Sequence, residues 1–255
     1  MNKVSVTVIT HNEERNIRDC FESVKWADEI IVVDAFSTDR TVAIAREYTD
    51  RVYQQDWSGY ASQNNRAIAH ATHEWILRVD ADERVDPDLA REIRQVLSAP
   101  GSCNGYRIPR KIFFLGRFLT RPERHHVRLF RKDKAHWVGE EIHEVLVVDG
   151  KTGRLRKPIH HLYVREIDPF IDKLNTYTTL HRSGKNRLPS VVQLMLGGMY
   201  TFVLEYVVHY RFLDGIRGLI YSRMRSFYTF TKYAKRWRER TRHADGLTPD
   251  SSGPR

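Results

Sequence analysis

Features of secreted and disulfide-stabilised proteins are scarce in this sequence. Only two cysteines, Cys20 and Cys103, occur among 255 residues, which is too few for a disulfide framework. The segment Met1 to Asn12 leads straight into a strand pattern and has no signal-peptide core. We therefore expect a cytoplasmic protein with reduced thiols.

A clean transmembrane segment is also lacking. The most apolar stretch, Val191 to Tyr210, carries Gln193, Glu205 and His209. An ionised side chain at the centre of a bilayer costs about 2.5–3.5 kcal/mol on insertion scales. A membrane span is therefore possible here but not favoured.

Acidic residues are outnumbered by basic ones, and low-complexity segments and internal repeats are missing. The hydrophobic content of 41% is enough for a real core. Forty-two Lys and Arg against thirty-two Asp and Glu give a formal charge of +10. Such a charge indicates an anionic partner, which would be a nucleotide, a nucleic acid or an acidic membrane surface. Charge alone does not choose among the three.

Strand and helix patterns alternate through the first 98 residues. Strands are expected at Lys3–Ile9, Glu29–Val33, Val52–Gln54 and Glu74–Val79, and helices at Glu13–Lys25, Val42–Tyr48, Ala61–His70 and Pro87–Leu97. Ser37 and Asp39 are expected to cap the second of these helices. This alternation predicts an α/β fold with a mostly parallel, doubly wound sheet, which binds ligands at the carboxyl ends of its strands.

The second half of the chain has a different pattern. Strands at Tyr106–Phe114 and His126–Phe130 are expected to extend the sheet in a mixed or antiparallel manner, and Val145–Leu155 resembles a hairpin with Asp149-Gly150 as its turn. Helices are expected at Asn175–Lys185, Val191–Tyr210 and Leu213–Arg240. The polar tail, residues 241–255, is expected to be disordered.

Acidic side chains follow three of the predicted strands, at Glu13, at Asp34 and in Asp80-Ala81-Asp82-Glu83. Two carboxylates one residue apart after a buried strand suit Mg²⁺ or Mn²⁺, because diphosphate oxygens can complete the coordination shell. We expect Asp82 to be the direct ligand and Asp80 to contact ribose or a bound water. A lone Asp-x-Asp is common in surface loops, and its position beside the other acidic strand ends gives it weight.

Four motifs in order carry a family resemblance. They are Thr10-His11-Asn12-Glu13, Val32 to Thr41, Gly59 to Asn65 and Val79 to Glu83. Together they resemble the family 2 glycosyltransferases, most closely the bacterial branch that includes lipopolysaccharide-core β-glucosyltransferases. The resemblance continues through Val127 to Arg131, His143-Glu144 and Lys173 to Tyr177.

The resemblance implies a GT-A fold and a nucleotide-sugar site. Thr10, Asn12 and Glu13 would line the base and ribose pocket, and Asp34 would accept hydrogen bonds from the nucleobase or ribose. Glu13 also suits the first turn of a helix, where it favours the helix dipole. Gln63 and Asn64 would approach the ribose or diphosphate.

The acceptor side of the site is expected in the second half of the chain. Glu144 is the candidate general base, with Glu140 or Glu141 as a substitute, and His143 is a further metal ligand or an acceptor contact. Arg128 and Arg131 flank an apolar pair in a strand. They would face the donor diphosphate or an acceptor phosphate, or else form the solvated side of that strand.

These expectations together describe an inverting transferase that uses Mg²⁺ or Mn²⁺. By resemblance it would move a hexose from a nucleotide diphosphate, UDP-glucose, to a lipid-linked saccharide such as lipopolysaccharide core. Residues 1–165 would form the GT-A domain, with a nucleotide-sugar half at 1–98 and an acceptor half at 99–165. Residues 166–240 would form a helical C-terminal extension, whose basic and aromatic helices would hold the protein on the inner face of the membrane or pack on the domain.

Two alternatives belong to other classes. A nucleotidyltransferase would need a Gly-rich phosphate loop after the first strand, and Thr10 to Glu13 lacks one. A non-catalytic basic module that binds a membrane or nucleic acid would not need Asp82. No nucleic-acid fold pattern accompanies the charge, so we expect no nucleic-acid partner.

Overall fold

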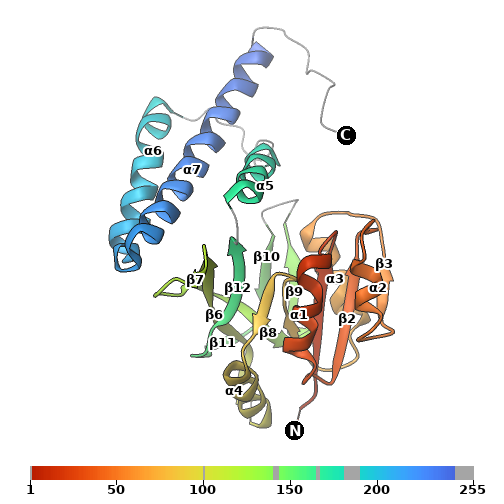
Figure 1. The fold of residues 1–255 in the computed structure, drawn as a ribbon. Coiled ribbons are helices and arrows are strands. Elements are labelled where there is room, and N and C mark those ends of the chain that lie inside the picture. The colour runs from red at the N-terminus through yellow and green to blue at the C-terminus, as the bar shows by residue number, and fades with distance from the viewer. Residues whose placement is uncertain (1, 100, 140–143, 165–166, 181–189, 245–255) are drawn as a thin grey trace. The chain divides into compact units, whose positions relative to one another are not determined.

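A computed structural model describes residues 2–99, 101–139, 144–164, 167–180 and 190–244 (Figure 1). The chain divides into two compact units. Unit 1 comprises Met1–Phe113 and Pro122–Tyr163, and unit 2 comprises Phe114–Arg121 and Val164–Arg255.

Unit 1 begins with the predicted alternation of strands and helices. Its elements are β1 (Val4–Thr10), α1 (Glu14–Val24), β2 (Glu29–Asp34), α2 (Thr41–Ala45), β3 (Val52–Gln54), α3 (Tyr60–His70) and β4 (Trp75–Arg78). It continues with β5 (Glu83–Val85), α4 (Pro87–Ser98), β6 (Cys103–Phe114), β8 (Glu123–Arg131), a 3₁₀ turn η1 (Lys132–Lys134), β9 (Ala135–Val138), β10 (Val145–Val148), β11 (Lys151–Arg154) and β12 (Ile159–Val164).

The large sheet has the strand order β3-β2-β1-β4-β8-β6-β12-β5. Strand β1 runs parallel to β2 and β4, and β2 runs parallel to β3, whereas β8 is antiparallel to both β4 and β6. The predicted α/β fold, with a mostly parallel sheet and an antiparallel extension, is thereby confirmed.

Helices cover both faces of this sheet, and the alternation of side chains along the strands explains why. Val4, Val6 and Val8 project from one face of β1 into a core shared with α1, α2 and α4. Ile31 and Ile76 belong to a second core, on the side of α3. A strand buried on both faces needs apolar or well-bonded side chains at every position, which accounts for the continuous apolar runs.

The predicted hairpin over Val145–Leu155 is wrong. Strand β10 pairs antiparallel with β9 in a separate two-stranded sheet, and β11 pairs in parallel with β6. Leu146 and Val148 pack against the α3-side core, so pairing with β9 buries the apolar face of β10. Asp149 and Gly150 still form a turn, with Gly150 at φ +95° and the Asp149 carbonyl accepting from the Asn104 amide at 2.7 Å.

The predicted capping of the helix after β2 is confirmed for Asp39, whose carboxylate accepts from the N–H of the first residue of α2, and is wrong for Ser37, which bonds Asp34. Arg40 is the N-cap of α2 and makes no side-chain capping bond. The Asp39 carboxylate instead accepts from the backbone N–H groups of Thr41, at 2.9 Å, and of Glu14, at 3.1 Å. Asp39 therefore connects α2 to the start of α1.

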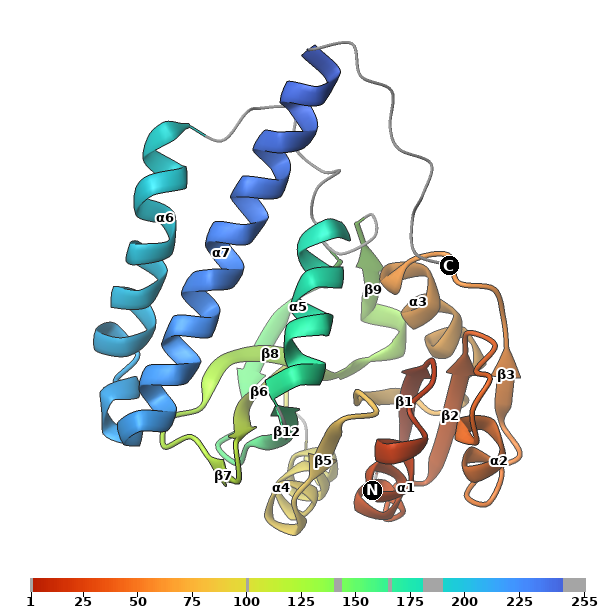
Figure 2. The same ribbon diagram turned by 45° about the horizontal axis from the view of Figure 1, so that its top comes forward.

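Unit 2 is built around two long helices. Its elements are β7 (Arg117–Phe118), α5 (Ile167–Leu180), α6 (Val191–Val203), a π-helical turn η2 (Leu204–Val208), a 3₁₀ turn η3 (Arg211–Asp214) and α7 (Gly215–Ala244). Helices α6 and α7 lie side by side in both ribbon views (Figures 1 and 2). The tail at 245–255 and the segment 181–189 lie outside the described residues.

Candidate functional site

The carboxyl ends of three neighbouring strands form the edge where sequence reasoning places the site. Thr10 lies directly opposite Asp34 in the ladder between β1 and β2. On the other side of β1, the backbone N–H of Val79 donates to the Thr7 carbonyl at 3.1 Å, which sets Asp80 at the same edge. The ends of β1, β2 and β4 therefore come together as predicted.

Asp34 holds the loop that follows β2. Its side chain is fully buried and accepts from the Ser37 N–H at 2.8 Å, from the Ser37 hydroxyl and from the Gln54 amide at 3.3 Å. Its carboxylate oxygens thus serve the protein's own loop in this structure. A direct contact between Asp34 and a nucleobase or ribose stays a prediction.

The loops after β1 and β2 are linked to each other. The Asn12 N–H donates to Ser37 Oγ at 2.8 Å, and the Asn12 side-chain oxygen accepts from the Thr38 N–H at 2.8 Å. Asn12 and Phe36 both have φ near +54°, a left-handed conformation that is uncommon outside glycine and concentrates at functional sites. Phe36 is half exposed, so a large aromatic ring stands at this edge.

Asp80 is fixed by two arginines. Two nitrogens of Arg78 lie 2.9 and 2.6 Å from its two carboxylate oxygens, and Arg128 Nη2 lies 3.1 Å from one of them. Arg128 is only 4% exposed and also bonds Glu83 at 2.8 Å. Glu83 in turn accepts from the Asp80 N–H at 3.0 Å. The predicted site arginine on β8 is therefore part of a buried ion network rather than a solvated strand face.

Glu83 is the most deeply placed acid of this network. Its side chain is fully buried, and burial together with the negative charge of Asp80 raises the pKa of its carboxyl well above the ordinary value. The hydrogen bond from Arg128 offsets part of the cost of burying a carboxylate. Through its bonds to the Asp80 N–H and to Arg128, Glu83 thus stabilises the turn that carries the two aspartates.

Arg78 connects this network to α3 and to the two-stranded sheet. Its Nε donates to the side-chain oxygen of Asn64 at 3.2 Å, and its guanidinium lies 5.4 Å from the centre of the Trp137 ring. Asn65 bonds the backbone of Trp137 in both directions, at 2.8 and 2.9 Å. Asn64, a predicted donor contact, is therefore a partner of Arg78 in this structure.

Asp82 faces a histidine. One carboxylate oxygen of Asp82 lies 3.1 Å from Nε2 of His161, and the two side chains are 15% and 9% exposed. The ladder between β5 and β12 places His161 opposite Glu83, and the Leu162 N–H donates to the Asp82 carbonyl at 2.9 Å. Strand pairing therefore fixes the distance between the carboxylate and the imidazole.

The pair fits a divalent cation that also binds phosphate. Carboxylate oxygen and imidazole nitrogen are both ligands of Mn²⁺, and Mg²⁺ takes one or two carboxylates when substrate phosphates and water supply the rest. Among the described residues, no group of three or more His, Cys, Asp or Glu side chains forms a metal site by itself. Asp82 and His161 would then provide two protein ligands, and the remainder would come from the donor.

The other predicted residues stand at different depths. Thr10 and Gln63 are buried, and the Gln63 amide donates to the Asp56 carbonyl at 2.8 Å. Glu13 accepts from the Asn16 amide at 2.8 Å. Glu144 is half-buried and immediately precedes β10. His143, Glu140 and Glu141 lie outside the described residues.

Sequence reasoning missed three residues of this site: Arg78, Glu83 as a buried network member, and His161. Arg78 is the last residue of β4 and stands two positions before Asp80, so a basic residue beside the acidic motif was a usable signal. His161 could not be found from sequence patterns, because it lies far from Asp82 in the sequence. Only the pairing of β12 with β5 brings the two residues together.

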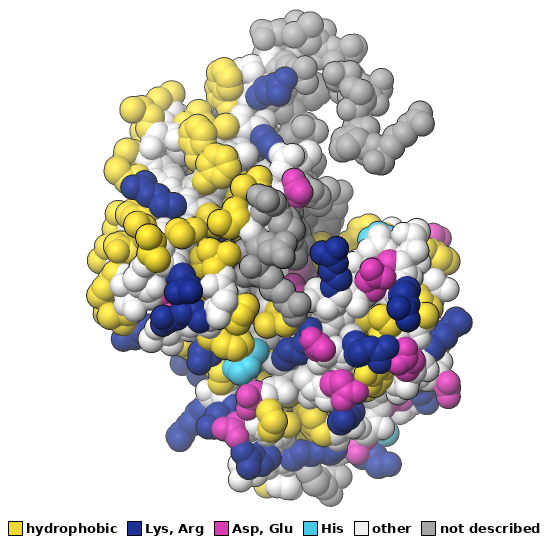
Figure 3. Space-filling view, in the orientation of Figure 1, with side chains coloured by type: hydrophobic (Ala, Val, Ile, Leu, Met, Phe, Trp, Pro, Cys, Tyr) yellow, Lys and Arg dark blue, Asp and Glu magenta, His cyan; other side chains and the backbone are white. Residues whose placement is uncertain are grey.

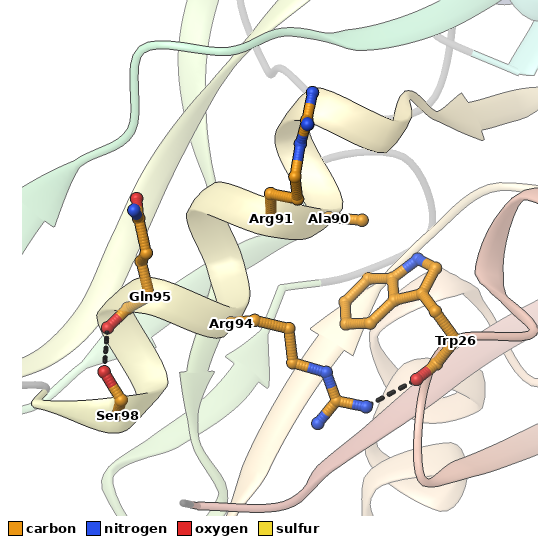
Figure 4. A pocket seen from close by; sticks show the side chains of 6 residues that line it. All are labelled: Trp26, Ala90, Arg91, Arg94, Gln95 and Ser98. Carbon is orange, nitrogen blue, oxygen red and sulfur yellow. Dashed lines mark hydrogen bonds between the residues drawn. The ribbon is translucent and has the colours of Figure 1, made fainter.

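A separate open hollow lies between the end of α1 and α4 (Figure 4). There the Arg94 guanidinium lies over the Trp26 ring, 5.2 Å from its centre, and donates a hydrogen bond to the Trp26 carbonyl. Arg94 also forms an ion pair with Asp28 at 2.9 Å. Asp28 also accepts from the N–H of Val4 at the start of β1. The hollow therefore lies at the amino-end edge of the parallel strands, opposite the edge where doubly wound sheets bind nucleotides.

Comparisons with known proteins agree with the geometry. Residues 5–163 match the model of glycosyl transferase family 2. The lipopolysaccharide core biosynthesis glycosyltransferase LpsC of Rhizobium meliloti (strain 1021) is 30% identical over 97% of this chain and 95% of its own. An uncharacterized glycosyltransferase of Rickettsia bellii is 28% identical over 91% of this chain and 85% of its own.

Solved structures give weaker similarities. S. aureus TarS 1–349 covers 96% of this chain and 92% of its own at 15% identity, with a TM-score of 0.49. The glucosyl-3-phosphoglycerate synthase of Mycobacterium tuberculosis in complex with Mg²⁺ and UDP covers 44% of this chain and 43% of its own at 22% identity, with a TM-score of 0.37. The family match spans nearly the whole large sheet and both aspartates, and the chain belongs to glycosyl transferase family 2, with the GT-A type of fold.

Proposed function

We propose that this glycosyltransferase is a metal-dependent, inverting enzyme that transfers a hexose, glucose from UDP-glucose, to a lipid-linked saccharide such as lipopolysaccharide core. The observation that carries the metal-dependent donor site is the pairing of Asp82 with His161 next to the fixed carboxylate of Asp80. The similarity to LpsC over almost the full length of both chains supports the acceptor class.

On the donor side, the linked loops after β1 and β2 would receive the nucleoside. Asn12 and Glu13 lie beside the Thr10–Asp34 pair, and their loop is held by Ser37 and Thr41. These bonds join the two loops to each other, and a pocket held in this way would lose less conformational entropy when a nucleotide binds. The exposed ring of Phe36 offers a surface on which a planar base can stack.

On the diphosphate side, Asp82 and His161 would hold Mg²⁺ or Mn²⁺. A bound cation of this kind neutralises the negative charge that develops on a departing diphosphate. Asp80 is held by Arg78 and Arg128, so its orientation is set by the protein and it would contact the ribose or a metal-bound water.

On the acceptor side, Glu144 would act as the general base. Inverting transfer requires a general base that takes the proton of the acceptor hydroxyl while the hydroxyl oxygen attacks the anomeric carbon, and a carboxylate can fill this role. The β9–β10 sheet that carries Glu144 is joined to the Asp80 network through Trp137 and Arg78. This link supports a role for the sheet in completing the site.

A donor screen tests the proposal. The purified protein is incubated with UDP-glucose, other UDP-hexoses and GDP-hexoses, and the released nucleotide is measured with and without a saccharide acceptor extracted from lipopolysaccharide core. We expect release from UDP-glucose to exceed release from the GDP-sugars at least tenfold. Equal release from both nucleotide classes would contradict the assignment of the donor.

A further inference from the structure

The outward surface of the α6–α7 pair is apolar. Along α6 the exposed apolar side chains recur every fourth residue as Val191, Met195, Met199 and Val203, with Val207 following in η2, and a parallel row is Val192, Leu196 and Tyr200. Along α7 the exposed apolar residues are Ile216, Leu219, Phe227, Phe230 and Trp237, also at helical spacing. Figure 3 shows hydrophobic side chains gathered over both helices. We call these three rows of side chains the apolar face.

The opposite side of α6 packs on α7, and the residues at this contact are small or polar. Thr201 Oγ1 lies 3.0 Å from Thr229 Oγ1, and Ser226 Oγ donates to the Gly198 carbonyl at 2.7 Å. A side chain at Gly197 would collide with the Tyr233 ring, since an added Cβ would lie 2.8 Å from it. The pair is thus polar inside and apolar outside, as helices that face lipid are.

The charges around the apolar face have one sign. Between residues 190 and 238 the acidic residues are Glu205 and Asp214, and both are buried. Glu205 pairs with His209 at 3.2 Å and Arg225 at 3.5 Å, and Asp214 accepts from Thr120. Over this range every exposed charge is therefore basic, with Arg223 lying among the apolar residues of α7.

The length and composition of Val191–Val208 would allow it to cross a membrane, but two other observations favour a helix pair that lies along the membrane surface. The segment Val191–Val208 is long and apolar enough to span a bilayer, with only 6% of it buried. However, its partner α7 carries Arg223 and Arg225 in its middle, which would enter the hydrocarbon core. The turn between the helices is also tied to residues 115–121, because Arg211 bonds the Arg121 carbonyl and Arg217 bonds the Leu115 carbonyl.

We propose that the apolar face binds the surface of an anionic phospholipid bilayer, with its side chains buried at the boundary between headgroups and acyl chains. An exposed apolar area of this extent is a binding surface in a folded protein. Basic residues at its border, together with a lack of exposed acidic ones within 190–238, match a negatively charged surface. This inference goes beyond the proposed function, since it requires neither donor nor acceptor.

Vesicle flotation of the full chain tests the inference. Vesicles contain phosphatidylcholine with or without phosphatidylglycerol, and the bound fraction is measured for the wild type and for the double variant Met195→Glu/Met199→Glu. These side chains are 73% and 59% exposed, so the substitutions leave the packed side of α6 intact. Val147→Glu, at an exposed position of β10, is the matched control.

We expect the wild type and Val147→Glu to float with phosphatidylglycerol vesicles, and the double variant to lose at least about tenfold in affinity. Bilayers with brominated acyl chains should also quench wild-type tryptophan fluorescence, and Trp237→Phe should abolish that quenching. Absence of flotation, or equal flotation of the double variant, would overturn the inference. So would a wild type that forms a stable dimer without lipid and a double variant that is monomeric, because a second copy would then cover the face.

Nucleotide release by the same preparations, measured on a water-soluble donor without vesicles, separates the two proposals. A double variant that no longer floats and still releases UDP supports the membrane surface and leaves the donor chemistry untouched. A wild type that floats and releases no nucleotide contradicts only the proposed function.

Discussion

Nε2 of His161 lies 3.1 Å from a carboxylate oxygen of Asp82, although 79 positions separate the two residues in the sequence. The antiparallel pairing of β12 with β5 produces this contact. A sheet strand is a rigid support, so the pairing holds the two candidate ligands close to each other.

Replacing His161 by Ala should weaken the use of metal. The variant would keep the Asp82 carboxylate and lose the imidazole, so we expect the Mn²⁺ concentration for half-maximal UDP release to rise about 10–100-fold. Isothermal titration of Mn²⁺ in the presence of UDP provides a second readout. His160→Ala is the control, because successive side chains of β12 point to opposite faces. An unchanged Mn²⁺ requirement in His161→Ala would remove His161 from the site.

Replacing Arg128 by Met should destabilise unit 1. Arg128 neutralises Asp80 and Glu83 in a buried network, and removal of one partner of a buried ion pair costs about 3–5 kcal/mol. Urea unfolding measures the loss. Arg131→Met is the matched control on the same strand, because Arg131 pairs with the half-exposed Glu74 and should cost less than about 1 kcal/mol. Equal losses in the two variants would mean that the network adds no stability.

The architecture of the first 98 residues, apart from the short strand β5, could be predicted from the sequence, because the alternation of strands and helices is set by local patterns. The sheet-edge positions of Thr10, Asp34 and Asp80 followed from the same reasoning. The strand partners of β10 and β11 could not be predicted. β10 pairs with β9 and β11 pairs with β6, and this choice depends on the packing of the folded chain and not on local sequence patterns. His161 was missed for the same reason, and so was the enclosure of Arg128 by two carboxylates.

Stability should fall with acidification through Glu29. Burial alone would raise its pKa, but hydrogen bonds from Ser5 and Thr72 and the charge of Arg51 outweigh burial and lower it. A lowered pKa adds stability that is present above the unfolded-state value of about 4.3 and is lost as the pH falls through the folded-state value. Glu29→Gln should therefore reduce the free energy of unfolding at pH 7 and make little difference at pH 2. A loss of equal size at both values would refute the role of the carboxylate charge.

The two thiols should differ in reactivity. Burial raises the pKa of the Cys20 thiol, and its side chain is fully inaccessible on α1, whereas Cys103 is half-buried. Because the thiolate is the reactive form, a disulfide reagent should modify one thiol quickly in the native protein and the second only on unfolding. Cys103→Ser should abolish the fast phase. A fast phase that survives this substitution would place Cys20 at the surface.

Glu144→Gln should abolish sugar transfer and leave UDP binding nearly unchanged. The amide preserves the shape of the side chain and cannot take a proton from the acceptor hydroxyl, and the loss of a general base costs about 10²–10⁴-fold in rate. Transfer to the acceptor and titration with UDP are measured on the same preparation. If UDP binding collapses with transfer, Glu144 is a ligand or a structural residue, and the base lies elsewhere.

The most direct test of the metal-dependent donor site is UDP release from UDP-glucose with and without Mn²⁺, in the wild type and in Asp82→Ala. We predict that release by the wild type requires the cation and that Asp82→Ala loses at least about a hundredfold in rate, equivalent to about 2.7 kcal/mol of transition-state stabilisation. Circular dichroism confirms that the variant is folded. Release that continues in a chelator, or that is unaffected by Asp82→Ala, would contradict the account.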